Sequence, residues 1–369
     1  MSVSRAASWA TDRGRQLVDG SRRFLVRNRL RIAAVVLLVG LVVAVAAWMG
    51  VDVWRIFTVG FVDRSLRAAT PIALAAVGGL YAEKSGVFNI GLEGFMIFGA
   101  VNAVAIAYLV SGDGAITQTH LWIGLVGAVL VSVLYTLIFA VLLIRYKADQ
   151  IVAGLAIWFL GLGFGPFTAV VIWGSQSSPT VGRIARIEIP VLSEIPIVGR
   201  LVFNNSPLVL LTILIVLVAW FVLYHTRYGY WVRAAGENPQ ALDTAGVDVN
   251  RVRYATVIFS GAMAGLGGAV LAIGLTTSFV GSGLTMVDGR GWIGIVAYLF
   301  GNYNPIGAFL AALLFGAADM FQVQLQTVGI DLPSTLMGLL PYVVVIVVLT
   351  FYGKTRMPAH VGDPYESEE

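Results

Sequence analysis

A few polar side chains that interrupt long apolar runs are the residues of this sequence best suited to chemistry. Asp319, Gln322 and Gln326 are spaced i, i+3 and i+7, which places them on one face of a helix that is otherwise apolar. A carboxylate inside a membrane helix is costly and usually faces a bundle interior or a water-filled path. The stripe therefore predicts either part of a transport pathway, with Asp319 as a site residue, or a polar contact between packed helices.

The sequence gives little support for a metal site, a nucleotide-binding site or a catalytic site. The chain has no cysteine, and the histidines at 120, 225 and 360 are too scattered for metal-ligand spacing. Gly353-Lys354-Thr355 is similar to the end of a phosphate-binding loop, but the position that would need the first glycine of that loop is Val348. The sequence contains no recognisable catalytic triad or carboxylate pair. We expect no metal site, no cofactor bound by the chain and no enzymatic activity.

The composition is that of a polytopic membrane protein. Apolar residues make up 58% of the 369 residues, charged residues only 12%, and the mean hydropathy is +0.85. Apolar runs of membrane-spanning length recur along the chain, which predicts an all-α fold with about ten transmembrane segments surrounded by lipid. The net charge of +4 is small and most basic residues flank the apolar runs, so we expect no nucleic-acid partner.

The distribution of charge predicts the orientation in the membrane. An arginine-rich leader, residues 1–31, precedes the first apolar run at 32–51, and most of the 24 Lys and Arg residues fall on the same predicted side as this leader. Because basic loops stay in the cytoplasm, both termini are expected there. The predicted transmembrane region then covers 32–352, with an outside loop at 174–206, and the acidic tail, 353–369, is expected to be unstructured.

Two apolar segments are too short to cross a bilayer, and each adjoins a polar link. Ala68–Ala82 leads into the link Ser85–Glu93, and Trp292–Phe300 follows the link Ser282–Arg290. The displacement that aligns Ser85 with Ser282 also aligns three further small residues, a weak sign of an inverted repeat of discontinuous helices. Polar backbone at membrane depth needs protein or water as its partner. The candidate residues for a substrate pathway in these links and in the helix of Asp319 are Ser85, Asn89, Glu93, Thr285, Asp288, Arg290 and Asp319.

Within this set, Asn89 and Thr285 are the best candidates for direct contact with a substrate. Glu93 and Arg290 occupy equivalent places in the repeat, so they could form an ion pair in one conformational state. From the residues alone, a pathway element and a plain turn at the membrane surface are equally good interpretations of the first link.

The stretch from 225 to 253 is polar and lies between two long apolar runs. Asn238 can cap a helix, Pro239 suits its first position, and Gly246 can end it in the left-handed region. Such a short helix is marginal alone in water. It indicates either a docking element or an ordinary connecting loop.

The order of residues in this stretch resembles that of a known family. Gly236, Glu237, Asn238 and Pro239, followed by Ala245, Gly246 and Val247, are similar to the cytoplasmic coupling loop of ABC importer permeases for nucleosides and simple sugars. The run from Glu83 to Gly94 and the segment from Asp149 to Ile157 also resemble these permeases. The resemblance extends from about residue 66 to residue 352.

The resemblance implies a function and a set of partners. The chain would be a permease subunit in the inner membrane, most similar to those for nucleosides, and its 225–253 loop would dock on a separate ABC ATPase subunit that binds ATP. A second, homologous permease subunit and an extracytoplasmic substrate-binding protein would complete the importer. The alternatives are a ribose-type sugar permease and an ion-coupled secondary transporter, in which Asp319 and Glu93 would be the ion-coupling carboxylates.

Overall fold

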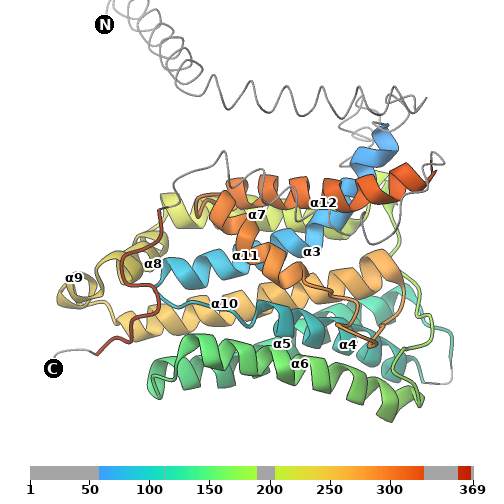
Figure 1. Ribbon diagram of the computed structural model, residues 1–369, viewed down its shortest axis with the longest axis horizontal. Coiled ribbons are helices and arrows are strands. Elements are labelled where there is room, and N and C mark those ends of the chain that lie inside the picture. Colours follow the sequence, from blue (N-terminus) through green and yellow to red (C-terminus); the bar gives the residue numbers. More distant parts are fainter. Residues whose placement is uncertain (1–57, 113, 189–203, 328–355, 367–369) are drawn as a thin grey trace, which may run out of the picture. The chain divides into compact units, whose positions relative to one another are not determined.

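The computed structural model describes residues 58–112, 114–188, 204–327 and 356–366, and these residues are mostly helical (Figure 1). Two residues of β1 (Ile187–Glu188) pair antiparallel with two of β2 (Asn204–Asn205). The predicted all-α class is confirmed. The helices are α3 (Val59–Lys84), α4 (Leu92–Ser111), α5 (Gln118–Ala140), α6 (Gln150–Trp173), α7 (Pro207–His225), α8 (Arg227–Glu237), α9 (Pro239–Thr244), α10 (Val249–Val270), α11 (Arg290–Phe300) and α12 (Pro305–Thr327).

Six helices among the described residues are long and apolar enough to cross a membrane. They are α4, α5 with its π-helical extension to Arg145, α6, α7, α10 with its π-helical extension to Thr276, and α12. The protein is therefore a multi-pass membrane protein, although the predicted count of ten segments is not confirmed. The leader 1–31 and the predicted segments 32–51 and 332–352 lie outside the described residues.

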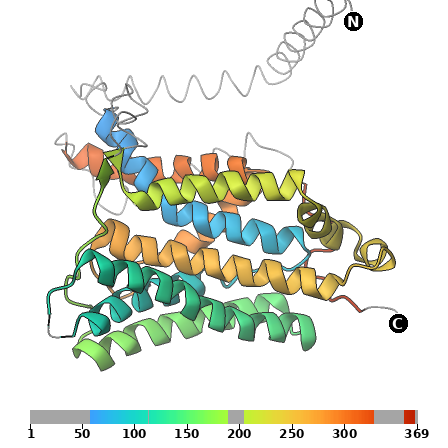
Figure 2. The same ribbon diagram turned by 180° about the vertical axis from the view of Figure 1, so that it is seen from behind.

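Two helices form the centre of this helical unit, which comprises the residues from Thr58 onward. α3 packs against α10, α11 and α12, and α10 also packs against α4 and α5. α6 covers α4, while α7 lies beside α3 and α12 (Figures 1 and 2). Almost every residue of α3 from Ala68 to Glu83 is buried, as expected for a helix that is apolar on all sides and enclosed by others.

α3 is longer than the sequence predicts. The expected short segment, Ala68–Ala82, is the buried part of a helix of 26 residues, about 39 Å long. The prediction was wrong because it ended the helix at the first charged side chains, whereas these are paired within the fold. Arg67 contacts Asp63 at 2.9 Å, and Arg64 donates a hydrogen bond to Gln324 of α12 at 2.7 Å.

Pro71 lies inside α3 without ending it. Proline has no N–H, so the carbonyl four residues earlier loses its normal partner. That carbonyl, of Arg67, accepts a hydrogen bond of 2.6 Å from the Thr70 hydroxyl instead. The Thr-Pro pair therefore allows a central helix to continue in surroundings without water.

α4 and α10 cross in close contact through small residues. A Cβ atom at Gly99 would lie 1.9 Å from the carbonyl oxygen of Gly265, and one at Gly268 would lie 1.8 Å from that of Met96. Small residues let membrane helices approach until their backbones touch. These glycines allow the short distance between α4 and α10. The first link leads directly into α4, so it also lies close to α10.

The C-terminal segment, residues 356–366, forms no helix or strand but is packed in place. Its backbone donates hydrogen bonds from His360 to the Gly236 carbonyl at 2.9 Å and from Gly362 to the Gly86 carbonyl at 3.0 Å. The expectation that the tail is unstructured was wrong for these residues. Acidic composition predicted it, but the contacts are made mainly by backbone groups and by Tyr365, which composition does not reveal.

Candidate coupling and translocation site

The predicted short helix is present as α9. The side chain of Asn238 accepts a hydrogen bond from the Ala241 N–H at 3.0 Å, and Pro239 holds the first helical position. Gly246 has a φ of +80° and donates to the Asp243 carbonyl at 2.7 Å. The expected caps are therefore confirmed, with Ala245 as the C-cap residue rather than part of the helix.

One side of α9 is buried and the other is open. Pro239 and Leu242 are its buried residues, and Leu242 packs with Ala235 of α8 and Val249 of α10. The exposed residues form a continuous polar and small-residue surface: Gln240, Ala241, Thr244, Ala245 and Gly246. Figure 1 shows α9 projecting beyond the ends of the long helices, so its open side is free to meet a partner.

Helix α8, which the sequence analysis treated as part of a loop, joins α9 to the centre of the unit. Its buried residues Gly229, Val232, Ala235 and Gly236 are spaced as on one helix face. A Cβ atom at Gly236 would lie 2.4 Å from the Lys84 carbonyl oxygen at the end of α3. Glycine at 236 thus permits α8 to touch α3, while the neighbouring Glu237 is exposed.

The first link, residues 85–93, is buried and attached to α10 by polar contacts. The hydroxyls of Ser85 and Thr256 are 2.7 Å apart, and the Asn89 amide donates to the Ser260 hydroxyl at 2.9 Å. The side-chain oxygen of Asn89 accepts from the Gly91 N–H at 3.0 Å. The polar side chains of Ser85 and Asn89 thus have protein partners in this conformation, as membrane depth requires.

Glu93 connects this link to the short helix α11. Its carboxylate accepts hydrogen bonds from the backbone N–H groups of Gly289 at 2.8 Å and Gly291 at 2.6 Å. These N–H groups begin α11, where the helix has no backbone acceptors of its own and favours a negative charge. A Cβ atom at Gly291 would lie within 2.5 Å of the Glu93 backbone nitrogen, so the approach requires glycine.

Arg290 is directed to a different acid from the one considered in the sequence analysis. Its guanidinium lies 3.3 Å from the Asp319 carboxylate of α12, and both side chains are partly exposed. In this conformation Glu93 engages the backbone on both sides of Arg290 rather than its side chain. The side chains of Gln322 and Gln326 lie outside the described part of the structure.

The second link differs from the first in its exposure. Thr285 is buried, its hydroxyl accepts from the Val287 N–H at 3.4 Å, and its φ is +62°. Asp288 is exposed with a φ of +46°. Thr285 and Asp288 therefore share an unusual left-handed backbone that the sequence did not indicate. α11 itself has 11 residues, about 16 Å of helix, and is short as predicted.

The turn between α11 and α12 brings a further polar residue to the end of α3. The Tyr303 hydroxyl donates to the buried Glu83 carboxylate at 2.7 Å. Burial is the main cause that raises the pKa of Tyr303, and the negative charge of Glu83 raises it further. Tyr303 therefore keeps its hydroxyl proton at neutral pH. The sequence analysis did not assign this pair, because nothing local connects residues from such distant segments.

The structure brings the predicted pathway residues together only in part. Glu93 meets the second link at Gly289 and Gly291, and Arg290 meets Asp319. Ser85 and Asn89 contact α10 instead. Thr256 and Ser260, their partners on α10, were missed. The signal that could have found them is that these two hydroxyl residues lie four positions apart in a stretch, residues 255–270, that is otherwise apolar or glycine.

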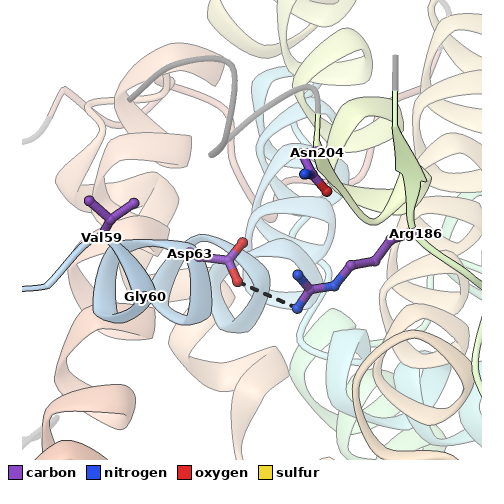
Figure 3. A pocket seen from close by; sticks show the side chains of 5 residues that line it. All are labelled: Val59, Gly60, Asp63, Arg186 and Asn204. Atoms are coloured by element: carbon purple, nitrogen blue, oxygen red, sulfur yellow. Dashed lines mark ion pairs between the residues drawn. The ribbon is translucent and has the colours of Figure 1, made fainter. Parts of the chain in front are cut away.

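A pocket of about 200 Å³ lies at the start of α3 (Figure 3), at the end of the unit away from α9 (Figure 1). It is lined by Val59, Gly60 and Asp63 of α3 together with Arg186 and Asn204. Asp63 and Arg186 form an ion pair across it at 3.7 Å. This pairing fixes the start of α3 to the segment that precedes β1.

Comparison with known proteins decides the family. Residues 61–349 match the family described as "Branched-chain amino acid transport system / permease component". The chain belongs to this permease family. The match covers nearly all of α3 and the helices from α4 to α12, and the chain is a transport component rather than an enzyme.

Individual relatives agree with the permease assignment. The chain is 36% identical to the guanosine ABC transporter permease protein NupQ of Bacillus subtilis, over 85% of this chain and 98% of the relative. It is 35% identical to the nucleoside ABC transporter permease protein NupC of Lactococcus lactis subsp. cremoris, over 80% and 93%. A putative glucose ABC transporter permease protein of Haloferax volcanii, TsgC13, is 31% identical over 75% and 80%. No solved structure gives a significant match.

Proposed function

We propose that this permease is the membrane subunit of an ATP-driven nucleoside importer. The observation that carries the proposal is its similarity to NupQ over 85% of this chain and 98% of NupQ, a share large enough to include α9 and both links. The sugar-transporter relative is less similar and is matched over a smaller share of both chains. A ribose-type substrate is therefore the weaker alternative.

The geometry of α9 supports coupling to a separate ATPase. The arm formed by α8 and α9 ends in an exposed surface and touches the end of α3 through Gly236. A push on α9 would therefore reach the first link and, through Glu93, the start of α11. This arrangement favours an ATPase-driven importer over an ion-coupled transporter, in which Glu93 and Asp319 would have to bind ions.

The complete importer would contain several further chains. We expect a second, homologous permease, an ABC ATPase that binds ATP, and an extracytoplasmic protein that delivers the nucleoside. In this arrangement the α9 end, the leader and the C-terminal tail face the cytoplasm, and the pocket beside Asp63 faces outward. The permease itself would bind no cofactor.

The substrate is expected to pass between the two links. Asn89 and Thr285 are buried in this conformation, so their contact with a nucleoside requires a second state in which the links separate. The absence of cysteine in the chain permits a direct check. Single cysteines at these positions should react with a water-soluble thiol reagent in a trapped ATPase state and remain protected in the resting state.

Uptake into proteoliposomes tests the proposal. The permease, purified with its ATPase and second permease, should accumulate radiolabelled guanosine when ATP and the binding protein are present, and unlabelled nucleosides should compete. Ribose and glucose should not compete at the same concentration. Competition by sugars alone would favour the sugar alternative, and uptake driven by an ion gradient without ATP would favour a secondary transporter.

A further inference from the structure

The C-terminal segment, residues 356–366, connects several elements at the α9 end. The backbone hydrogen bonds from His360 to Gly236 and from Gly362 to Gly86 attach it to α8 and to the first link. The Arg356 N–H donates to the Asn302 side chain at 3.1 Å, at the turn between α11 and α12. The segment thus touches the elements that would have to move together during coupling.

Arg253 holds this segment against the first link. Its side chain is buried and donates to the Ser85 carbonyl at 3.2 Å and to the Asp363 carbonyl at 2.8 Å. The guanidinium also lies 5.9 Å from the ring centre of Tyr365. At Gly86, which has a φ of +95°, an added Cβ would come within 2.7 Å of the guanidinium. The Arg253 side chain therefore lies between the first link and the C-terminal segment and contacts both.

Tyr365 contacts α9 directly. Its hydroxyl donates to the Asp243 carboxylate at 2.5 Å, and its ring packs against the cluster of Ala235, Leu242 and Val249. α9 has six residues, of which only Pro239 and Leu242 are buried. A helix so short is not stable alone, so contacts from outside it decide how it is held.

A last contact lies at the edge of the segment, where Lys147 pairs with Glu366. Both side chains are exposed, and exposed pairs contribute little to stability. Tyr365 and Arg253 therefore account for the attachment of the tail better than this ion pair does.

We propose that residues 356–366 form a brace that fixes the orientation of α9, with Tyr365 and Arg253 as positioning residues for coupling to the ATPase. The proposal rests on the function proposed above. The brace links the docking surface of α9 to the first link. A force on α9 would then move the first link instead of only bending the arm formed by α8 and α9.

A spin label attached at Gln240→Cys tests the brace in the full-length permease assembled with its ATPase. Gln240 is exposed on α9 and beside the tail, and this chain has no other cysteine, so it can be labelled before assembly. Tyr365→Phe removes the hydroxyl and keeps the ring, and Asp243→Ala removes its acceptor. Each should increase label mobility and, in the complex without the Gln240→Cys change or the label, lower nucleoside-stimulated ATP hydrolysis about tenfold, as expected for one lost charge-assisted hydrogen bond. Asp243→Asn, which keeps an acceptor, should be milder.

The double variant distinguishes a shared contact from two separate defects. If Tyr365 and Asp243 act through one bond, combining the changes should add almost nothing to either alone. Tyr146→Phe, an exposed tyrosine at the same end, is the matched control and should change neither measurement. Unchanged label mobility, or additive effects, would overturn the brace without bearing on the nucleoside function. Failure of the unaltered complex to transport nucleosides would overturn the proposed function and leave the mobility result standing.

Discussion

The carboxylate of Glu93 accepts the backbone N–H of Gly291 at 2.6 Å, although the two residues belong to segments far apart in the sequence. The second carboxylate oxygen accepts from Gly289, so Glu93 satisfies the start of α11. The residue that caps this short helix therefore lies at the beginning of another helix, α4. Displacement of α4 relative to α11 would leave the N–H groups at the start of α11 without their acceptor. Relative movement of the two links is therefore opposed by this contact.

Substitution of Glu93 by Gln should destabilise the permease. A glutamine has one acceptor oxygen and an NH₂ group that faces the other N–H, so one buried donor loses its partner, at a cost of about 1–3 kcal/mol. We expect a lower melting temperature of the purified protein and reduced uptake. Asp288→Asn is the control for the melting temperature alone, since Asp288 is exposed and asparagine tolerates its positive φ. Equal melting temperatures for Glu93→Gln and the unaltered protein would show that the contact does not stabilise the fold.

Gly99 should not tolerate alanine. The added Cβ would lie 1.9 Å from the Gly265 carbonyl oxygen, so α4 and α10 must separate, with an expected cost of about 1–3 kcal/mol. Gly163 in α6 is a matched control because nothing lies within 4 Å of a Cβ there, and alanine should be neutral or stabilising by about 0.5–1 kcal/mol. Thermal unfolding of both variants measures the difference. A similar effect at the two positions would contradict the close crossing.

Glycine at position 246 should be required for its backbone conformation and not because a side chain would be crowded there. Its φ is +80° and a Cβ there would meet nothing within 4 Å. Valine in this left-handed conformation costs about 1–2 kcal/mol, whereas asparagine adopts it readily. Gly246→Val should therefore reduce nucleoside-stimulated ATP hydrolysis while Gly246→Asn retains most of it. If both variants couple normally, the end of α9 is not part of the coupling surface.

Reporter fusions should place the two ends of the helical unit on opposite sides of the membrane. The excess of basic residues near α9 predicts that a fusion at Gln240 reports a cytoplasmic position and one at Gln176 an outside position. A phosphatase reporter, active only outside the cytoplasm, and a fluorescent protein give complementary signals. The same signal at both positions would contradict the proposed orientation.

Features with local causes could be predicted from the sequence. Asn238, Pro239 and Gly246 act within a few residues of their own positions, so α9 and its caps were foreseen, and the shortness of α11 followed from its apolar run. α8 was missed although its buried residues repeat at helical spacing, because the whole stretch from 225 to 253 was treated as one polar segment between two apolar runs.

Features that depend on distant partners could not be predicted in this way. The length of α3 depends on pairing of its charged residues with distant groups, Arg64 with Gln324 and Asp63 with Arg186. The burial of Asn89 depends on Ser260 of α10. The attachment of the tail depends on Tyr365 and Arg253, which lie far apart in the sequence. In each case the polar residue is visible in the sequence, but its partner can be identified only from the folded structure.

Photo-crosslinking from α9 tests the central claim, that this permease is driven through α9 by a separate ATPase. A benzophenone amino acid at Ala241, which is exposed on α9, should form an adduct with the ATPase subunit in the assembled transporter, and its yield should change when ATP is bound. The same amino acid at Gln176, at the opposite end, should give no such adduct. An assembled, transport-active complex in which Ala241 never captures the ATPase would contradict the account.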